Sequence, residues 1–182
     1  MKKVLVVIDM QNDFITGALR NEDAIKIVPY VKKKIEEAWD LGARIVFTKD
    51  THGEDYMESE EGANLPVKHC IKGSEGWEII DELEAKKYAD LIIEKETFGS
   101  TKLAEYFEEN KDDIDEVEFV GVCTDICVIS NVLITKAVMP NKKIYVDAAG
   151  CAGVCLESHD TALNAMKACH IKIKNENKEA FR

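Results

Sequence analysis

Short apolar runs alternate with longer amphipathic stretches along most of the chain. The runs are rich in β-branched residues without polar alternation, which is typical of strands covered on both faces, and they occupy residues 3–8, 44–49, 90–94, 117–121, 143–146 and 170–174. Helical patterns lie between them, at residues 22–41, 77–85, 101–110, 125–139 and 157–168. This alternation predicts a doubly wound, Rossmann-like α/β fold, with three α/β/α layers around a six-stranded parallel sheet. Residues 1–182 are expected to form a single domain.

Three chemically distinctive residues stand at the ends of predicted strands. Asp9 follows the first strand, Lys95 follows the strand that includes residues 91–93, and Cys127 lies just beyond the strand at 117–121. The carboxyl ends of parallel strands share one edge of the sheet, and ligands bind at that edge in open α/β sheets. An acid, a lysine and a cysteine are therefore predicted to converge there.

Cys127 stands on a strand-to-helix turn. Thr124 or Asp125 can act as the N-cap of the following helix, which places Cys127 in its first turn. The positive end of the helix dipole there favours a thiolate over a thiol, as a nucleophile requires. The alternative interpretation is a small buried residue, because free cysteine is among the most buried residue types.

A second group of polar residues lies in the long irregular stretch at residues 51–74, which exceeds the usual length of a loop. Asp50 and His52 are two residues apart at a strand end and therefore point to the same side of an extended backbone. His69 follows after an acidic run. Asp and His are common ligands of divalent metals, so the group is a candidate metal site; the alternative is a solvated surface loop.

The net charge and the lengths of the apolar runs argue against several classes of partner and location. A formal net charge of −11 argues against nucleic acid or an anionic membrane as a partner. No apolar run approaches the ~20 residues that span a bilayer, and the apolar run at 4–8 lacks a cleavage site for export. We therefore expect a cytoplasmic protein whose six cysteines are reduced.

Three segments carry a resemblance to a known family. Residues 9–14 read DMQNDF, residues 95–101 read KETFGST and residues 121–128 read GVCTDICV. They resemble the signature segments of the isochorismatase-like cysteine hydrolases, and within that superfamily the chain is most similar to nicotinamidases and pyrazinamidases, from residue 3 to about residue 173. The resemblance implies a catalytic triad of Asp9, Lys95 and Cys127. It also implies an oxyanion hole formed by the backbone amides of Cys123 and Cys127, and a cis peptide bond between Val122 and Cys123.

The same resemblance implies one divalent metal ion on Asp50, His52 and His69. Glu58 or Glu61 could supply a fourth ligand, and the sequence does not decide between them. Zinc is the expected ion, with manganese or iron as alternatives. The expected partner is a small amide substrate, and members of this superfamily are often homo-oligomers.

Two features leave the substrate open. Nicotinamidases usually carry a tryptophan before the distal histidine, but residues 64–68 read NLPVK here, and the loop at residues 15–19 is short. Phe14, Phe98 or Tyr56 could supply an aromatic face instead. The leading prediction is a cysteine-dependent amidase that releases ammonia from nicotinamide through a thioester. The alternatives are another amide or carbamoyl substrate, or a non-catalytic metal- or thiol-binding module.

A competing use of the cysteines is a structural zinc site. Two CxxxC pairs are present, and together they could form a four-thiolate site from Cys123, Cys127, Cys151 and Cys155. Such a site would consume the thiolate that the triad needs. Cys151 and Cys155 could instead be plain thiols or a redox-sensitive pair.

Overall fold

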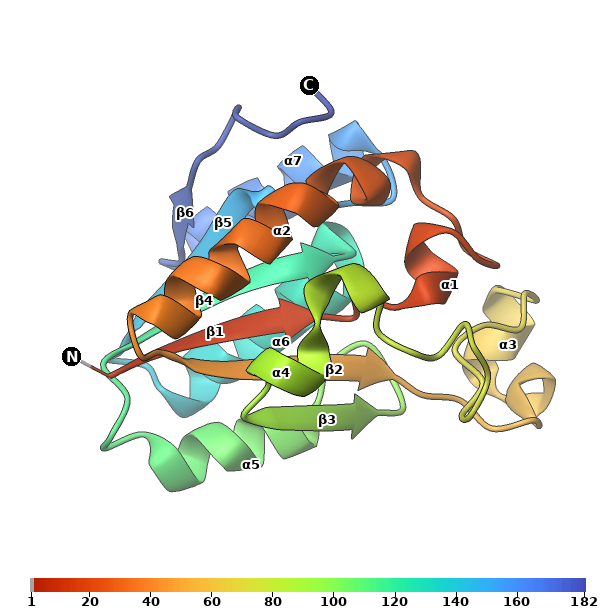
Figure 1. Ribbon diagram of the computed structural model, residues 1–182, viewed down its shortest axis with the longest axis horizontal. Helices are drawn as coiled ribbons and strands as arrows, with labels where there is room; N and C mark the ends of the chain where they lie inside the picture. Colours follow the sequence, from red (N-terminus) through yellow and green to blue (C-terminus); the bar gives the residue numbers. More distant parts are fainter. Residues whose placement is uncertain (1) are drawn as a thin grey trace.

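A single parallel sheet forms the centre of the molecule. The computed structural model describes residues 2–182. Its strands are β1 (Lys3–Ile8), β2 (Arg44–Asp50), β3 (Leu91–Lys95), β4 (Glu116–Val122), β5 (Lys143–Ala152) and β6 (Lys172–Lys174). They lie in the order β3-β2-β1-β4-β5-β6, and every neighbouring pair is parallel. The predicted doubly wound α/β fold with six parallel strands is therefore confirmed (Figure 1).

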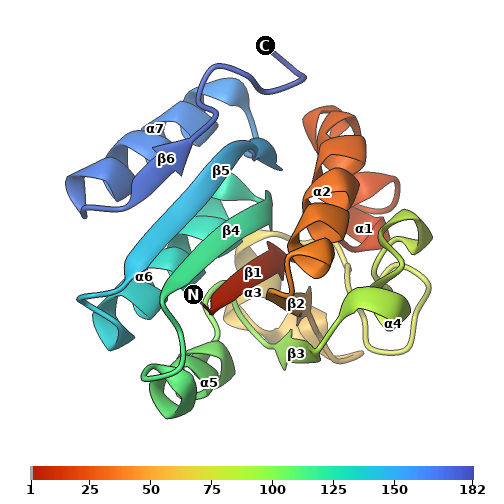
Figure 2. The ribbon, with the colours of Figure 1, turned by 60° about the vertical axis from the view of Figure 1, so that its left-hand side comes forward.

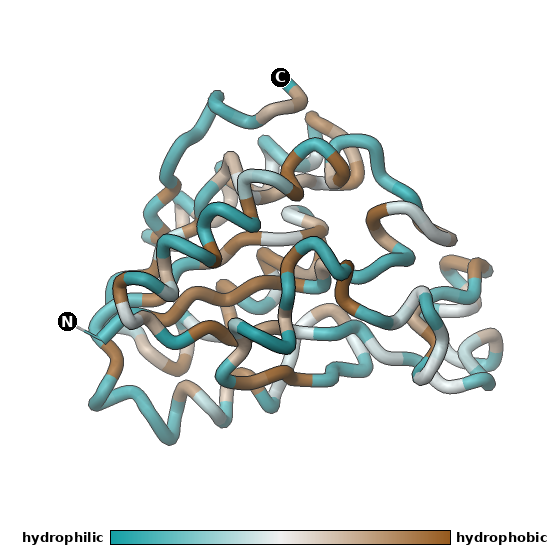
Figure 3. Tube along the Cα trace, viewed as in Figure 1, coloured by the Kyte–Doolittle hydropathy of each residue, from teal (hydrophilic) through white to brown (hydrophobic). Residues whose placement is uncertain are grey.

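Helices cover both faces of the sheet (Figure 2). The long helix α2 (Glu22–Asp40) packs on one face, whereas α5 (Thr101–Asn110), α6 (Ile129–Val138) and α7 (Leu156–Ala168) pack on the other. Alternate residues of β1 point to opposite faces, so that Leu5 and Val7 join the core under α2, and Val6 joins the core under α5 to α7. In Figure 3 the apolar residues accordingly follow the strands and the inner sides of the helices.

The strand order reverses between β1 and β4, which run side by side although over a hundred residues separate them. Ile8 pairs with Gly121 at the carboxyl end of this pair. Gly121 has a φ of 121°, and a Cβ added to it would lie 2.1 Å from the carbonyl oxygen of Ile8. A glycine is therefore required for the two backbones to approach where the sheet changes direction, which is the usual position of a ligand site in such folds.

The predicted helix at residues 77–85 is wrong. Ile79 forms an antiparallel bridge with Gln11, and the amide of Ile80 donates to the carbonyl of Met10, so this stretch is extended. A 3₁₀ turn (Asp81–Leu83) and the short helix α4 (Ala85–Tyr88) follow, separated by Glu84 at a φ of 48°. Burial of the two isoleucines under α2 decides the local structure here rather than helical periodicity.

Strand β5 is longer than predicted, because it continues from residue 146 to Ala152. Its second half reads DAAGCA, and small residues, Asp and Gly have low β propensity. These residues are nevertheless buried, and a Cβ on Gly150 would lie 2.7 Å from a methyl carbon of Val120. Tertiary packing thus selects a strand that local sequence does not indicate. The predicted strand at 170–174 is shorter, since His170 has a φ of 64°.

The predicted helix at residues 125–139 begins as a wide π-helical turn, Thr124–Val128, called the π-turn below, and continues as α6. The amide of Val128 donates to the carbonyl of Cys123, five residues back. Neither Thr124 nor Asp125 caps the helix, because their side chains bond elsewhere. Single π-helical turns occur frequently at functional sites.

The long irregular stretch at 51–74 contains a 3₁₀ turn (Tyr56–Glu58) and the short helix α3 (Glu60–Asn64). The short helix α1 (Asn12–Ile15) follows β1. Within residues 2–182, no helix combines the length and the apolar character needed to cross a membrane.

Candidate active site

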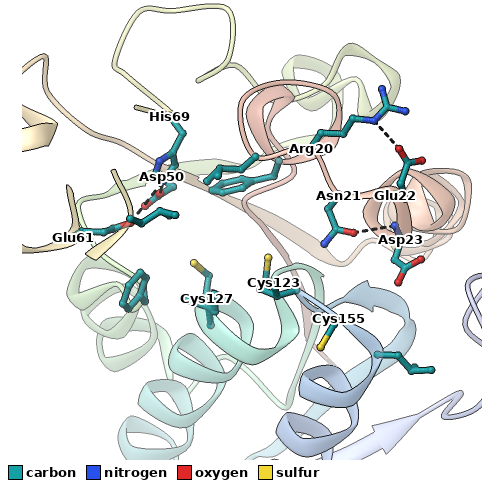
Figure 4. Close-up of a pocket in the computed structure, with 17 residues that line it drawn as sticks. Arg20, Asn21, Glu22, Asp23, Asp50, Glu61, His69, Cys123, Cys127 and Cys155 are labelled. Carbon is teal, nitrogen blue, oxygen red and sulfur yellow. Dashed lines mark hydrogen bonds and ion pairs between the residues drawn. The ribbon is translucent and has the colours of Figure 1, made fainter. Parts of the chain in front are cut away.

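A cavity of about 580 Å³ opens at the carboxyl edge of the sheet, where β1 and β4 meet. Figure 4 shows the sulfur atoms of Cys123 and Cys127 pointing into it from one side, with Asp50, Glu61 and His69 on another. Several separate parts of the chain therefore contribute to one space, among them the end of β2, the loop that follows it, the segment that leads into α2, the π-turn and the segment that leads into α7.

The structure brings Asp9, Lys95 and Cys127 together, and Cys127 also lines this cavity. The Lys95 Nζ lies 2.6 Å from Asp9 Oδ2 and 3.5 Å from Cys127 Sγ, so the ammonium group stands between the carboxylate and the thiol. All three residues are buried. The sequence placed them at three strand ends, and the parallel sheet makes those ends neighbours.

Hydrogen bonds to neighbouring strands and helices fix these side chains. The Thr48 hydroxyl donates to Asp9 Oδ1 at 2.6 Å, and Lys95 also donates to the carbonyl of Thr97. The side-chain amide of Asn131 donates to the carbonyl of Cys127 at 2.7 Å and thereby holds the π-turn on α6. Groups that are locked in this way need little reorganisation when they react.

Burial shifts the pKa values of Asp9, Lys95 and Cys127 and so affects which of them carry a proton. Burial raises the pKa of Cys127 well above the ordinary thiol value and outweighs the opposing charge of Lys95, so the free enzyme holds a thiol, not the thiolate that the helix dipole suggested. Burial also raises the pKa of Asp9, which makes this carboxylate a stronger base. The pKa of Lys95 is lowered by burial but raised further by the charges of Asp9, Cys127 and Asp50, so it stays cationic.

The backbone around Cys123 has the features that the resemblance implied. The peptide bond between Val122 and Cys123 is cis. Cys123 immediately precedes the π-turn, and its side chain lines the cavity with that of Cys127. The amides of these two cysteines are thus placed at the beginning of a helix, where backbone N–H groups favour a developing negative charge.

Beside this group, four side chains converge as a candidate metal site. One ligand atom from each of Asp50, His52, Glu61 and His69 lies within 4.8 Å of the others. His52 Nε2 is 2.9 Å and His69 Nε2 is 3.5 Å from Asp50 Oδ2, and both nitrogens are 3.7 Å from Glu61 Oε1. The structure therefore places Glu61 in this cluster, whereas Glu58 faces a different hollow.

The donor atoms fit a divalent metal ion. His69 Nδ1 is 2.8 Å from the carbonyl of Val67, which can only accept, so Nδ1 carries the proton and Nε2 offers its lone pair to the cluster. Two imidazoles and two carboxylates form a mixed nitrogen and oxygen set that suits zinc. Burial alone would raise the pKa of Asp50, but the adjacent imidazoles of His52 and His69 and the positive charge of Lys95 together lower it, which keeps this ligand ionised.

Sequence reasoning missed the side chains that hold these loops. Gln11 donates to the carbonyl of Asp50 and accepts from its amide, at 2.8 and 2.7 Å, and so fixes the end of β2. Asp13 Oδ2 accepts from the amide of Cys70 at 2.7 Å, next to His69. Both residues lie in the DMQNDF segment that carries the resemblance, but their partners are distant in sequence.

The three candidate aromatic residues differ in whether they line the cavity. Phe14 and Phe98 line the cavity. Tyr56 does not: its buried ring packs against His52 and His69, and its hydroxyl donates to the carbonyl of Leu65. Leu65 itself lines the cavity, in the segment where nicotinamidases usually carry tryptophan. The wall near the metal cluster is therefore apolar and only partly aromatic.

The outer wall is a second feature without a sequence signal. It includes Arg20 and Asn21, which directly precede α2, and Val154 and Cys155, which directly precede α7. The four-thiolate alternative does not form among the described residues, because Cys151 is buried in β5 and Cys155 is exposed. All six cysteines are free thiols.

Comparisons with known proteins agree with this geometry. The protein-family model described as the isochorismatase domain matches residues 3–175 of the sequence. The pyrazinamidase of Pyrococcus horikoshii, solved in complex with zinc, is 30% identical with a TM-score of 0.82, over 95% of this chain and 98% of that one. The nicotinamidase of Schizosaccharomyces pombe is 24% identical over 94% of this chain and 92% of its own length. The N-carbamoylsarcosine amidase of Thermoplasma acidophilum is 26% identical with a TM-score of 0.77, over 97% and 98% of the two chains. The chain therefore belongs to the isochorismatase family and is a hydrolase.

Proposed function

We propose that this protein is a cysteine-dependent amidohydrolase that converts nicotinamide to nicotinate and ammonia through a thioester. The observation that carries the proposal is the junction of Asp9, Lys95 and Cys127, the last of which lines a cavity whose adjoining wall is a metal-type cluster. The relatives whose names state nicotinamide or pyrazinamide hydrolysis support this choice of substrate.

The first step needs a nucleophile that burial keeps protonated. Asp9, with its raised pKa, takes the proton of Cys127 as the sulfur attacks the amide carbonyl. Lys95 stabilises the sulfur while it becomes negative, since its Nζ is 3.5 Å away. The negative charge then moves to the carbonyl oxygen, toward the amides of Cys123 and Cys127.

The second step releases ammonia. Protonated Asp9 gives its proton to the amide nitrogen, the C–N bond breaks, and a thioester on Cys127 remains. Asp9 then takes a proton from water, and the oxygen attacks the thioester. The C–S bond breaks, and Asp9 returns the proton to the departing sulfur, which gives the carboxylic acid, the Cys127 thiol and the Asp9 carboxylate. One carboxyl group thus serves as base and acid in turn, and burial, which raises its pKa, favours both roles over those of an ordinary carboxyl group.

The metal cluster would hold a divalent ion on Asp50, His52, Glu61 and His69. Bound there, the ion supplies a Lewis-acidic anchor for an electron pair of the substrate. Phe14 and Leu65 border the same region of the cavity and would contact the faces of a ring. Substrate orientation then comes from the cluster, and the chemistry comes from the neighbouring triad.

A second substrate class is supported by a specific observation. The cavity wall carries Leu65 where an aromatic stacking partner is usual in nicotinamidases, and one similar structure is an amidase of a carbamoyl compound. A non-aromatic carbamoyl amide would therefore also fit the apolar wall, with the same triad cleaving its C–N bond.

The deciding experiment measures ammonia release by the zinc-loaded protein from nicotinamide, pyrazinamide and N-carbamoylsarcosine. Turnover of nicotinamide that disappears in Cys127→Ala is the expected result. Turnover of only the carbamoyl compound would replace the substrate and keep the triad. No turnover of any of the three would contradict the proposal.

A further inference from the structure

The C-terminal tail packs against His159 of α7, and this helix in turn contacts the turn that carries Cys127. After β6 the tail runs back along α7 toward its N-terminal end (Figure 1). The match to the isochorismatase domain ends at residue 175, so residues 176–182 lie beyond it. Glu179 in this tail is nevertheless only 4% exposed, and the Phe181 ring packs edge-on against His159 at 5.4 Å.

A chain of three buried side chains connects this tail to the π-turn. Glu179 Oε1 lies 3.3 Å from Nε2 of His159, and Nδ1 of the same imidazole lies 2.8 Å from the hydroxyl of Thr124. Thr124 is the first residue of the π-turn, three positions before Cys127. His159 and Thr124 are completely buried, so no solvent competes for these bonds.

Glu179 also fixes the direction of the hydrogen bonds. Burial alone would raise the pKa of Glu179, but the hydrogen bonds from Arg182 and His159 and the charge of Arg182 together lower it, so this carboxylate is ionised and can only accept. His159 must then carry its proton on Nε2, which leaves a lone pair on Nδ1. The Thr124 hydroxyl therefore donates to Nδ1 and is held in one orientation.

We propose that Glu179 and His159 are positioning residues of the active site, which act through the Thr124 hydroxyl to fix the π-turn and the amides of Cys123 and Cys127. The readout in catalysis rests on the proposed amidase function. The mechanism requires these amides to meet an oxyanion that exists only during the reaction. Loosening the turn should accordingly lower kcat and leave KM nearly unchanged.

Matched variants of the zinc-loaded, full-length protein test each hydrogen bond between Glu179, His159 and Thr124. Glu179→Ala and Thr124→Val should each lower kcat about ten- to hundredfold, as small misplacements at a reacting centre do. Glu179→Gln and Thr124→Ser keep an acceptor and a hydroxyl and should recover most of the loss. The double variant Glu179→Ala/Thr124→Val should be no slower than the worse single variant, because both changes break one chain. Multiplied losses, or no recovery by the conservative variants, would overturn the proposal.

A measurement without substrate separates this proposal from the amidase function. Hydrogen exchange of the backbone amides at residues 124–128 should accelerate in Glu179→Ala and stay at the wild-type rate in Glu179→Gln. Asp160→Asn is the control. It removes the carboxylate charge on α7 that pairs with Arg182 of the tail, and it leaves His159 bonded to Glu179. Faster exchange confined to the tail of Glu179→Ala would overturn the positioning role, even if no amide substrate were ever turned over.

Discussion

Two groups of charged side chains share the cavity, and they are built differently. The triad group, Asp9, Lys95 and Cys127, stands at the ends of strands and on the π-turn, and all three residues are buried. The metal group takes Asp50 from a strand end but Glu61 and His69 from the long loop, and the Glu61 side chain remains 18% exposed. The strand ends and the adjoining π-turn therefore set the first group, whereas the second also depends on loop contacts such as the hydrogen bond from the Cys70 amide to Asp13.

Removing the nucleophile should give the largest effect and separate chemistry from folding. Cys127→Ala is expected to lower kcat by about 10⁴-fold or more, because no other group forms the thioester. The thermal midpoint should change little, since only a sulfur atom is lost. Ammonia release and a thermal melt measure the two quantities, and Cys169→Ala, an exposed cysteine, is the control. Activity near wild type in Cys127→Ala would place the nucleophile elsewhere.

Replacing the general base, Asp9, should have the second largest effect, and the pH dependence of the wild type tests whether Asp9 is buried. Asp9→Asn should lower kcat by about 10²–10⁴-fold, as expected for loss of a general base. In the wild type, burial raises the pKa of Asp9 above the ordinary value of 3.8. Because the base must be ionised, kcat/KM should fall as the pH decreases through that raised pKa, so the acid limb should lie above pH 3.8. A limb at or below this value would contradict an enclosed Asp9.

The metal group should show a smaller and different response. Glu61→Gln should weaken zinc binding by about 10–100-fold, an effect typical of a disturbed metal environment, whereas Glu58→Gln should not weaken it. Competition with a chelator gives the affinity, and metal analysis of the dialysed protein gives the content. Chelator-treated wild type should lose turnover and regain it with added zinc. Equal zinc affinity of Glu61→Gln and the wild type would remove Glu61 from the site.

The smallest expected effect concerns the apolar cavity wall near the metal group. Leu65→Trp would supply the ring that nicotinamidases usually carry. An aromatic pair contributes about 0.5–1.5 kcal/mol, which corresponds to a roughly 2–12-fold lower KM for nicotinamide. Leu65→Met, which keeps the wall apolar and similar in size, is the control. A higher KM in the tryptophan variant would mean that the wall is shaped for a different substrate.

The sequence predicted the fold and the triad group for the same reason. Apolar runs locate strands, parallel strands share an edge, and Asp9 and Lys95 stand directly at that edge. The choice between Glu58 and Glu61 could not be predicted, because it depends on how the 3₁₀ turn and α3 orient the loop. Similarly, Leu65 and not Tyr56 lines the cavity, since the Tyr56 ring fills the space behind the histidines.

The errors in secondary structure have a common physical origin. The stretch at 77–85 has helical periodicity, but Ile79 and Ile80 are held extended by backbone bonds to residues that lie far away in sequence. The second half of β5 lacks strand formers, but its small side chains allow it to lie close against the end of β4. The secondary structure of both segments depends on hydrogen bonds and packing spaces that exist only in the complete fold. A short window of sequence carries no information about them.

Gly121 touches neither the substrate cavity nor the metal group, yet it determines how closely β1 and β4 approach at the point from which Asp9 and the π-turn emerge. Any side chain there would meet the Ile8 carbonyl and push the two strands apart. In evolutionary terms the position has no neutral alternatives among the other amino acids. A survey of missense changes would therefore rank it with the nucleophile, although its contribution is the absence of a side chain.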